Sequence, residues 1–175
     1  DYLQVMNEQM ERFFAIEPYR TYRDYFDVYT AIAVSPENGI GGVNTIRDTK
    51  FGTTFTNDVG LLGEYDEIFA YVMKIPSVNE SNLSQSLIVI TPNTTDYGGI
   101  TQMWEDGSAI AFCPLSGDNY PYDARGIVQH EAGGHGFGKL GDEYIYYNSF
   151  IDDCLCLGTF KWGKALGWYE NLSLT

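Results

Sequence analysis

The two histidines of this 175-residue chain lie five positions apart in one short stretch, "QHEAGGHGFG". His130 and His135 enclose Glu131 and a glycine pair, and two carboxylates follow in "LGDEY". Imidazole nitrogens and carboxylate oxygens are common zinc ligands, and a catalytic zinc takes three protein ligands and keeps one position open for water. The sequence therefore predicts a metal site in which His130 and His135 are two of the ligands.

The spacing of the histidines conflicts with a regular α-helix. Each α-helical residue advances by about 100°, so positions four apart share a face and positions five apart differ by about 140°. Gly133 and Gly134 lie between the histidines, and glycine is a poor α-helix residue. A one-residue π-bulge there would return His135 to the face of His130, and such bulges occur frequently at functional sites. We expect this distortion of the helix.

The remaining parts of a catalytic site are also present in this stretch. Glu131 follows the first histidine, as the general base does in H-E-x-x-H metalloproteases. From there its carboxylate can take a proton from zinc-bound water and hand it to the leaving amine. Gly136 and Gly138 would end the helix and let the chain turn back toward the metal. We favour Asp142 as the third ligand; Glu143 is the alternative, or else a hydrogen-bond acceptor for a ligating histidine.

With its surroundings, this stretch resembles the bacterial metallopeptidases grouped with the IgA-specific peptidases. In that family a helix of the form H-E-x-G-H-x-F-x-x-L-x-D-E-Y carries the zinc, and the matching downstream residues here are Phe137, Leu140, Asp142, Glu143 and Tyr144. A "YGG" after a hydrophobic strand also recurs in the family, as in "SLIVITPNTTDYGGITQ" of this chain. The fold that the resemblance implies is α+β and metzincin-like, with a twisted mixed sheet packed on an active-site helix.

The resemblance also assigns roles to individual residues. It implies that His130, His135 and Asp142 bind zinc, and it makes Glu131 the base. Two features depart from the family pattern. The histidines are one residue further apart, which is similar to dipeptidyl peptidase III, and the last methionine, Met103, lies upstream of the position where metzincin-like sites have a methionine turn. We therefore expect one catalytic domain over residues 1–175, truncated at its C-terminal end.

The site should be positioned by a mixed set of helices and strands. Apolar periodicity predicts a helix over residues 2–16 and another over about 57–73, capped by Asn57, with Leu61, Leu62, Tyr65, Phe69 and Val72 facing inward. Strands are expected over 25–35, 50–55, 85–92, 100–104 and 108–114, and a short helix near 160–166. Asp123 is expected to cap the motif helix. This order predicts an α+β sheet with the motif helix packed beneath it.

Composition excludes several classes of partner. Ten Lys+Arg against 24 Asp+Glu give a net charge of -14, which argues against nucleic acids and anionic membranes, since both attract basic proteins. The longest apolar runs are far shorter than the roughly 20 residues of a membrane span. Abundant aromatic residues and 19 glycines favour a secreted or cell-surface protein. Cys113, Cys154 and Cys156 are interpreted either as one disulfide and a free thiol or as three buried thiols.

The sequence thus predicts a secreted zinc endopeptidase that hydrolyses peptide bonds of extracellular proteins by metal-activated water. Its partner would be a peptide or protein substrate, and IgA is what the resemblance suggests for some relatives. The strand after "YGG" is either an edge that pairs with the substrate or an ordinary hairpin strand. A non-catalytic binding module on a protease fold and a zinc exopeptidase are the alternative functions. Tyr144, Tyr146 or Tyr147 could stabilise the oxyanion, but core packing is the favoured interpretation for any one of them.

Overall fold

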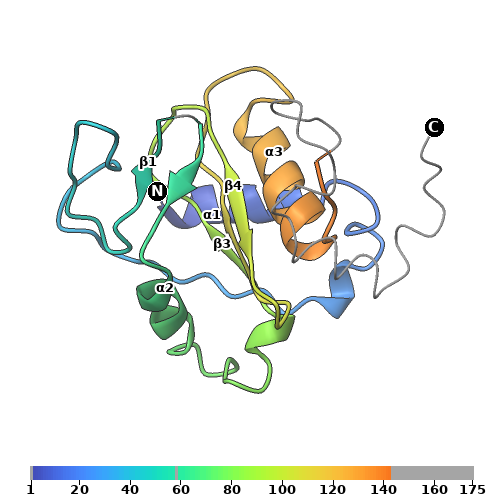
Figure 1. Ribbon diagram of the computed structural model, residues 1–175. Helices are drawn as coiled ribbons and strands as arrows, with labels where there is room; N and C mark the ends of the chain where they lie inside the picture. Colours follow the sequence, from blue (N-terminus) through green and yellow to red (C-terminus); the bar gives the residue numbers. More distant parts are fainter. Residues whose placement is uncertain (1, 58, 143–175) are drawn as a thin grey trace.

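A computed structural model describes residues 2–57 and 59–142. These residues form a mixed α+β fold in which a small sheet lies beside one long helix (Figure 1). That helix begins as α3, Ala124–Ile127, and continues without a break as η3, Val128–Phe137. The first helix, α1 (Tyr2–Phe13), contacts it. The predicted α+β class and the packing of the motif helix against a mixed sheet are confirmed.

Three strands form the sheet that faces the motif helix. They are β3 (Leu87–Ile90), β4 (Ile100–Met103) and β5 (Ala109–Phe112), in the spatial order β3-β5-β4. The central strand β5 runs parallel to β3 and antiparallel to β4. All four residues of β5 are buried, as expected for a central strand that is covered on both faces. The three predicted strands over 85–114 are confirmed, and β3 and β4 are the two edge strands of this sheet.

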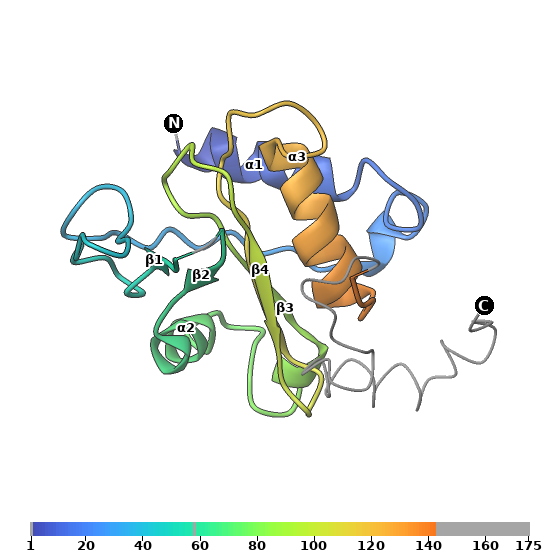
Figure 2. The same cartoon turned by 45° about the horizontal axis from the view of Figure 1, so that its top comes forward.

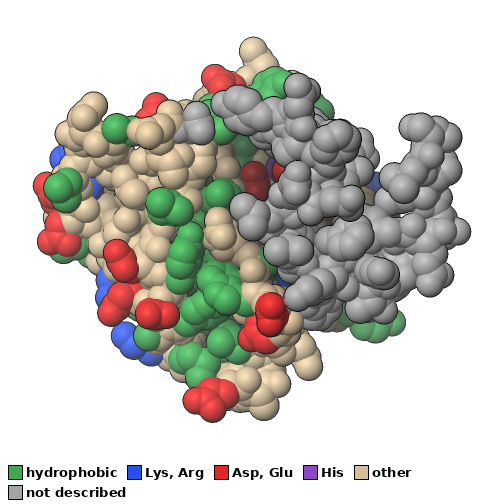
Figure 3. Space-filling model, viewed as in Figure 1, with side chains coloured by type: hydrophobic (Ala, Val, Ile, Leu, Met, Phe, Trp, Pro, Cys, Tyr) green, Lys and Arg blue, Asp and Glu red, His purple; other side chains and the backbone are tan. Residues whose placement is uncertain are grey.

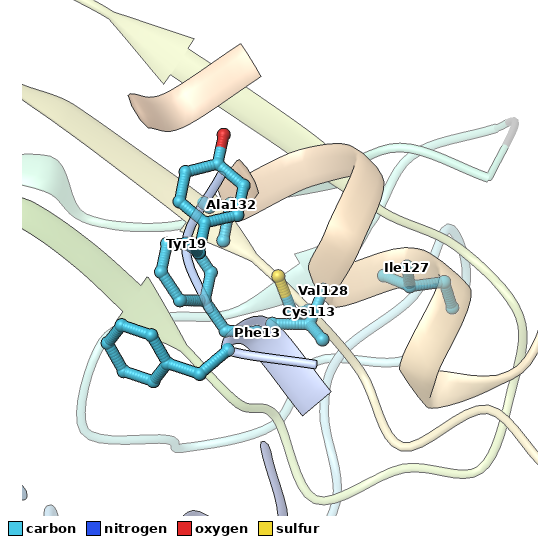
Figure 4. Packing of buried hydrophobic residues seen from close by; sticks show 8 residues of the cluster. Phe13, Tyr19, Cys113, Ile127, Val128 and Ala132 are labelled. Carbon is cyan, nitrogen blue, oxygen red and sulfur yellow. The ribbon is translucent and has the colours of Figure 1, made fainter. Parts of the chain in front are cut away.

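The side chains of β5 alternate between two hydrophobic clusters, one on each face of the sheet. The cluster on the side of the motif helix is shown in Figure 4 and contains Phe13, Phe14, Tyr19, Ala111, Cys113, Ile127, Val128 and Ala132. The second cluster contains Leu61, Ile68, Ile88, Ile110 and Phe112. The helix-facing residues of β5 and the segment after it, Ala111 and Cys113, are small, so the sheet offers the motif helix a close packing surface.

Small elements complete the second face of the sheet (Figure 2). Strands β1 (Thr54–Phe55) and β2 (Leu61–Leu62) form an antiparallel pair, and the helix α2 (Tyr65–Val72) follows. Two short 3₁₀-helices, η1 (Arg23–Tyr25) and η2 (Leu83–Gln85), lie in the connections. Among the described residues no helix has the length and apolar character that a membrane crossing requires.

One predicted strand was wrong, and one predicted helix is confirmed only over its second half. No strand forms over 25–35, where Tyr25 and Val34 are 84% and 80% exposed, because no neighbouring strand covers these side chains. The helix predicted from Asn57 begins only at Tyr65, since the residues before it form β2. Leu62, expected to face inward, is 44% exposed. The helix predicted near 160–166 lies outside the described residues.

Candidate metal centre

The motif helix begins where the sequence predicted. Asp123 Oδ1 accepts a hydrogen bond from the backbone N–H of Gly126 at 2.8 Å, so Asp123 is the expected N-cap. After one α-helical turn the helix becomes a π-helix over Val128–Phe137. In a π-helix the hydrogen bonds join residues five apart, which is the spacing of the two histidines. The predicted π distortion is confirmed, but it extends over ten residues rather than one.

The middle of η3 is fixed by contacts with the N-terminal part of the chain. The Tyr19 hydroxyl donates a hydrogen bond to the Gly133 carbonyl at 2.5 Å. The Gln129 amide donates to the Arg12 carbonyl at 3.1 Å. Tyr19 is buried, and burial raises the pKa of its hydroxyl, so it acts here as a neutral donor. These bonds fix the part of the helix that carries the histidines.

A tight turn after η3 brings the chain back toward the histidines. Lys139 adopts a left-handed backbone conformation, with φ 54°, while the N–H of Leu140 bonds to the Gly134 carbonyl at 3.0 Å. The Lys139 ammonium donates to the Gly136 carbonyl at 2.6 Å and to the Gly107 carbonyl at 2.9 Å. The latter contact links the turn to the β4–β5 connection. Asp142 follows two residues after this turn.

Three side chains converge at the end of the helix. The Oδ1 atom of Asp142 lies 3.2 Å from His130 Nε2 and 3.1 Å from His135 Nε2. The two Nε2 atoms lie 3.1 Å from each other. Bonds of about 2.0–2.1 Å in tetrahedral geometry would hold zinc ligands about 3.3 Å apart. The three donors are therefore spaced as ligands of one such ion.

The hydrogen bond of the His135 ring favours a metal-binding tautomer. His135 Nδ1 lies 2.7 Å from the Leu140 carbonyl, which can only accept, so Nδ1 carries the proton. In the neutral ring the Nε2 atom of His135 then has a free lone pair on the side of His130 and Asp142. A backbone carbonyl bonded to the other ring nitrogen is also the usual support of a metal-binding histidine. For His130, burial and the neighbouring His135 lower the pKa, which favours the neutral, metal-binding form.

Glu131 lies beside this triad in a protected environment. Its side chain is only 8% exposed. Burial raises the pKa of Glu131 to about 7, although His135 and a hydrogen bond from Thr101 act in the opposite direction. A carboxylate with a pKa in this range is a competent general base near neutral pH. A divalent cation nearby would bring the pKa of Glu131 down.

The structure also shows a functional candidate that the sequence interpretation missed. Thr101 in β4 lies 2.9 Å from the Glu131 carboxylate through its hydroxyl. The only signal was its position two residues after the "YGG" segment. Of the other sequence candidates, Cys113 is buried and forms no disulfide with another described residue. The remaining ones, Glu143, Tyr144, Tyr146, Tyr147, Cys154 and Cys156, lie outside the described residues.

An apolar hollow lies at the end of β4, where three of its lining residues pack against the second hydrophobic cluster. It has a volume of about 450 Å³ and is lined by Phe69, Leu83, Trp104, Glu105, Asp106 and Ser108. Trp104 directly follows the last residue of β4, so the hollow lies at the end of the strand that carries Thr101. On the face shown in Figure 3, acidic side chains lie at several separate places rather than in one patch.

Comparison with known proteins agrees with this geometry. The family described as IgA Peptidase M64 matches residues 1–152, a range that includes the whole motif helix and the converging triad. No curated protein matches the chain. The family match covers most of the sequence and not only the histidine motif. The chain therefore belongs to the IgA Peptidase M64 family and is a metallopeptidase.

Proposed function

We propose that this metallopeptidase is a zinc-dependent endopeptidase that cleaves extracellular proteins. One observation carries the proposal: His130, His135 and Asp142 place three donor atoms within 3.1–3.2 Å of one another, next to the buried carboxylate of Glu131. Two imidazoles and one carboxylate with this spacing suit zinc. The architecture proposed for residues 1–175 is a single catalytic domain of the metzincin-like type.

Each residue of the proposed site has a distinct task. His130, His135 and Asp142 would hold zinc, which supplies Lewis-acid polarisation of the scissile carbonyl and a lower pKa for water. Glu131 takes a proton from the attacking water and then donates it to the nitrogen of the leaving amine, so that the carboxylate is regenerated. Burial of Glu131 limits its exchange with bulk solvent during this transfer.

The position of β4 at an edge of the sheet favours an extended peptide as substrate. This strand lies at one end of the order β3-β5-β4, and an extended peptide can add to such an edge by backbone hydrogen bonding. A peptide along β4 would pass Thr101, which contacts Glu131, and reach the hollow beside Trp104. The family description points to immunoglobulin A as substrate. Because that protein is extracellular, we also propose a secreted or cell-surface location.

The test combines metal content with proteolysis of immunoglobulin A and casein. The zinc-loaded wild type should bind one zinc per chain, as measured by elemental analysis, and cleave at least one internal peptide bond. Glu131→Gln should retain zinc and lose cleavage, because the amide cannot take the proton. Glu80→Gln, at an exposed glutamate between α2 and η2, is the matched control and should behave as wild type.

Three other outcomes would contradict parts of this proposal. Full activity of Glu131→Gln would remove Glu131 from the role of base. Zinc binding without cleavage of either protein would favour a non-catalytic binding module. Release of terminal residues alone, with a requirement for a free substrate terminus, would identify an exopeptidase.

A further inference from the structure

We propose that Thr101 is a positioning residue for Glu131, and that the Gly99–Thr101 segment is shaped to receive this carboxylate. The inference rests on the proposed role of Glu131 as the base. It assigns a task to the "YGG" segment, which the metal site itself does not use. The contacts come from both ends of this short segment.

Two hydrogen-bond acceptors of Glu131 lie within reach of the Thr101 hydroxyl. Thr101 Oγ1 is 2.9 Å from Glu131 Oε2 and 2.8 Å from the backbone carbonyl oxygen of the same residue. A hydroxyl has one proton to donate, so it serves one acceptor at a time. The bond to the ionised carboxylate is the stronger one. Thr101 therefore holds Oε2 while Glu131 is ionised and leaves Oε1 free to take the proton.

Gly99 forms the second contact with the same side chain. A Cβ atom at this position would lie 2.8 Å from Glu131 Oε1 and 2.9 Å from its Cγ. Any larger residue would have to displace the carboxylate. Gly99 and Thr101 are two positions apart in an extended segment, so they contact Glu131 from the same face. One contact supplies a hydrogen bond, and the other supplies the space.

The sheet fixes the orientation of Thr101. Thr101 pairs directly with Ala111 of β5, and Ala111 belongs to the cluster that packs on the motif helix. Directly paired residues project to the same face of a sheet, so Thr101 points toward the helix. Threonine is branched at Cβ and has a stiff χ1. Its hydroxyl is thus held by the strand, whereas Glu131 has several rotatable bonds that need an external constraint.

The first experiment measures catalysis in Thr101 variants. The zinc-loaded wild type is incubated with immunoglobulin A and casein, the cleaved bond is identified, and a quenched peptide containing that bond is used for kinetics. Thr101→Val keeps the shape and removes the hydroxyl. We expect kcat to fall by about 10- to 100-fold, as for a misplaced catalytic group, with KM unchanged within about twofold. Thr101→Ser should recover most of the activity.

Controls separate positioning from loss of folding or metal. Thr54→Val removes a strand hydroxyl in β1 and should retain wild-type kinetics. All variants should bind one zinc per chain and unfold cooperatively. Equal kcat values for Thr101→Val and wild type would overturn the inference, as would failure of Thr101→Ser to restore activity.

The second experiment needs neither zinc nor activity. Carbon-13 NMR of the metal-free protein, labelled at glutamate carboxyl carbons, reports on Glu131 directly; Glu131→Gln assigns its resonance. Thr101→Val should shift this resonance and Thr101→Ser should leave it nearly in place. An unmoved resonance in Thr101→Val would refute the hydrogen bond. Full activity of Glu131→Gln would instead refute the base, so the two failures are distinguishable. Absence of cleavage by the wild type would refute the proposed function, whereas the NMR result would still decide whether Thr101 holds the Glu131 carboxylate.

Discussion

Substitution of Gly126 tests how closely the start of the motif helix approaches the loop before it. A Cβ atom at Gly126 would lie 1.8 Å from the carbonyl oxygen of Pro121 and 2.5 Å from its carbonyl carbon. Close carbon–oxygen contacts are about 3.3 Å, so Gly126→Ala requires a backbone shift of about 1.5 Å. Backbone atoms cannot rotate away as a side chain does. The substitution must therefore displace the loop or the helix, four residues before His130.

The matched control is Gly134→Ala in the same helix. A Cβ atom there would meet only the Gln129 carbonyl oxygen, at 3.9 Å. Both variants gain about 0.4–1 kcal/mol because alanine lowers the entropy of the unfolded chain, and this gain cancels in the comparison. Overpacking costs about 1–3 kcal/mol, and this is the expected difference in free energy of unfolding. With a urea m-value of about 2 kcal/mol/M, the midpoint of Gly126→Ala should lie on the order of 1 M below that of Gly134→Ala.

The assay is urea unfolding of the chelator-treated proteins, followed by circular dichroism, so that metal binding does not contribute to stability. Elemental analysis of the zinc-loaded variants provides a second readout, because a displaced helix start should also weaken the site. Equal midpoints for Gly126→Ala and Gly134→Ala would refute the close contact with Pro121. In that case the start of the helix would be less constrained than the structure indicates.

Three further predictions concern acidic residues. Asp142→Asn should weaken zinc binding by more than about 100-fold, which is the upper range for residues that only support a ligand. Glu143→Gln should retain zinc binding. The opposite result in a chelator competition titration would make Glu143 the third ligand. Asp123→Ala should lower the free energy of unfolding by about 1 kcal/mol through loss of the cap, and Asp123→Ser should restore most of it in urea unfolding. Hydrogen bonds from Ser108 lower the pKa of Asp106 in the folded protein below its ordinary value. Ionised Asp106 therefore stabilises the fold at pH values above the pKa of the unfolded chain. This stabilisation is lost as the pH falls through the pKa of the folded protein. Thermal unfolding of wild type and Asp106→Asn should therefore differ near neutral pH and converge in acid, and a constant difference would contradict the shift.

The local signals of the motif helix were sufficient to predict where it starts and that it is distorted. Asp123 is a favourable cap, and the histidine spacing together with Gly133 indicated a π distortion. The length of the π-helix could not be predicted, because it is accompanied by tertiary contacts. Tyr19 binds the Gly133 carbonyl and Lys139 binds the Gly136 carbonyl, and neither partner is identifiable from the motif alone.

The errors elsewhere also arose where tertiary contacts, rather than local sequence signals, decide the structure. The aromatic and β-branched residues over 25–35 have high strand propensity, but propensity reflects packing against neighbours, and these side chains have no covering strand. Glycines at 60 and 63 were a neglected signal against a helix starting at Asn57. Thr101 could not be assigned, because its partner Glu131 is 30 residues away and is brought near only by the packing of the sheet on the helix.

The π-helix also bears on how the chain accommodates a change in length. Tyr19 fixes the middle of η3, and the turn at Lys139 is anchored to the β4–β5 connection. A residue inserted between the histidines cannot lengthen the helix without breaking one of these anchors. The wider turns of the π-helix accommodate the extra residue instead. His135 then remains next to His130, and Asp142 remains in contact with both histidines. The π-helix thus allows the spacing of the histidines in the sequence to change while the three side chains of the candidate metal site keep their positions.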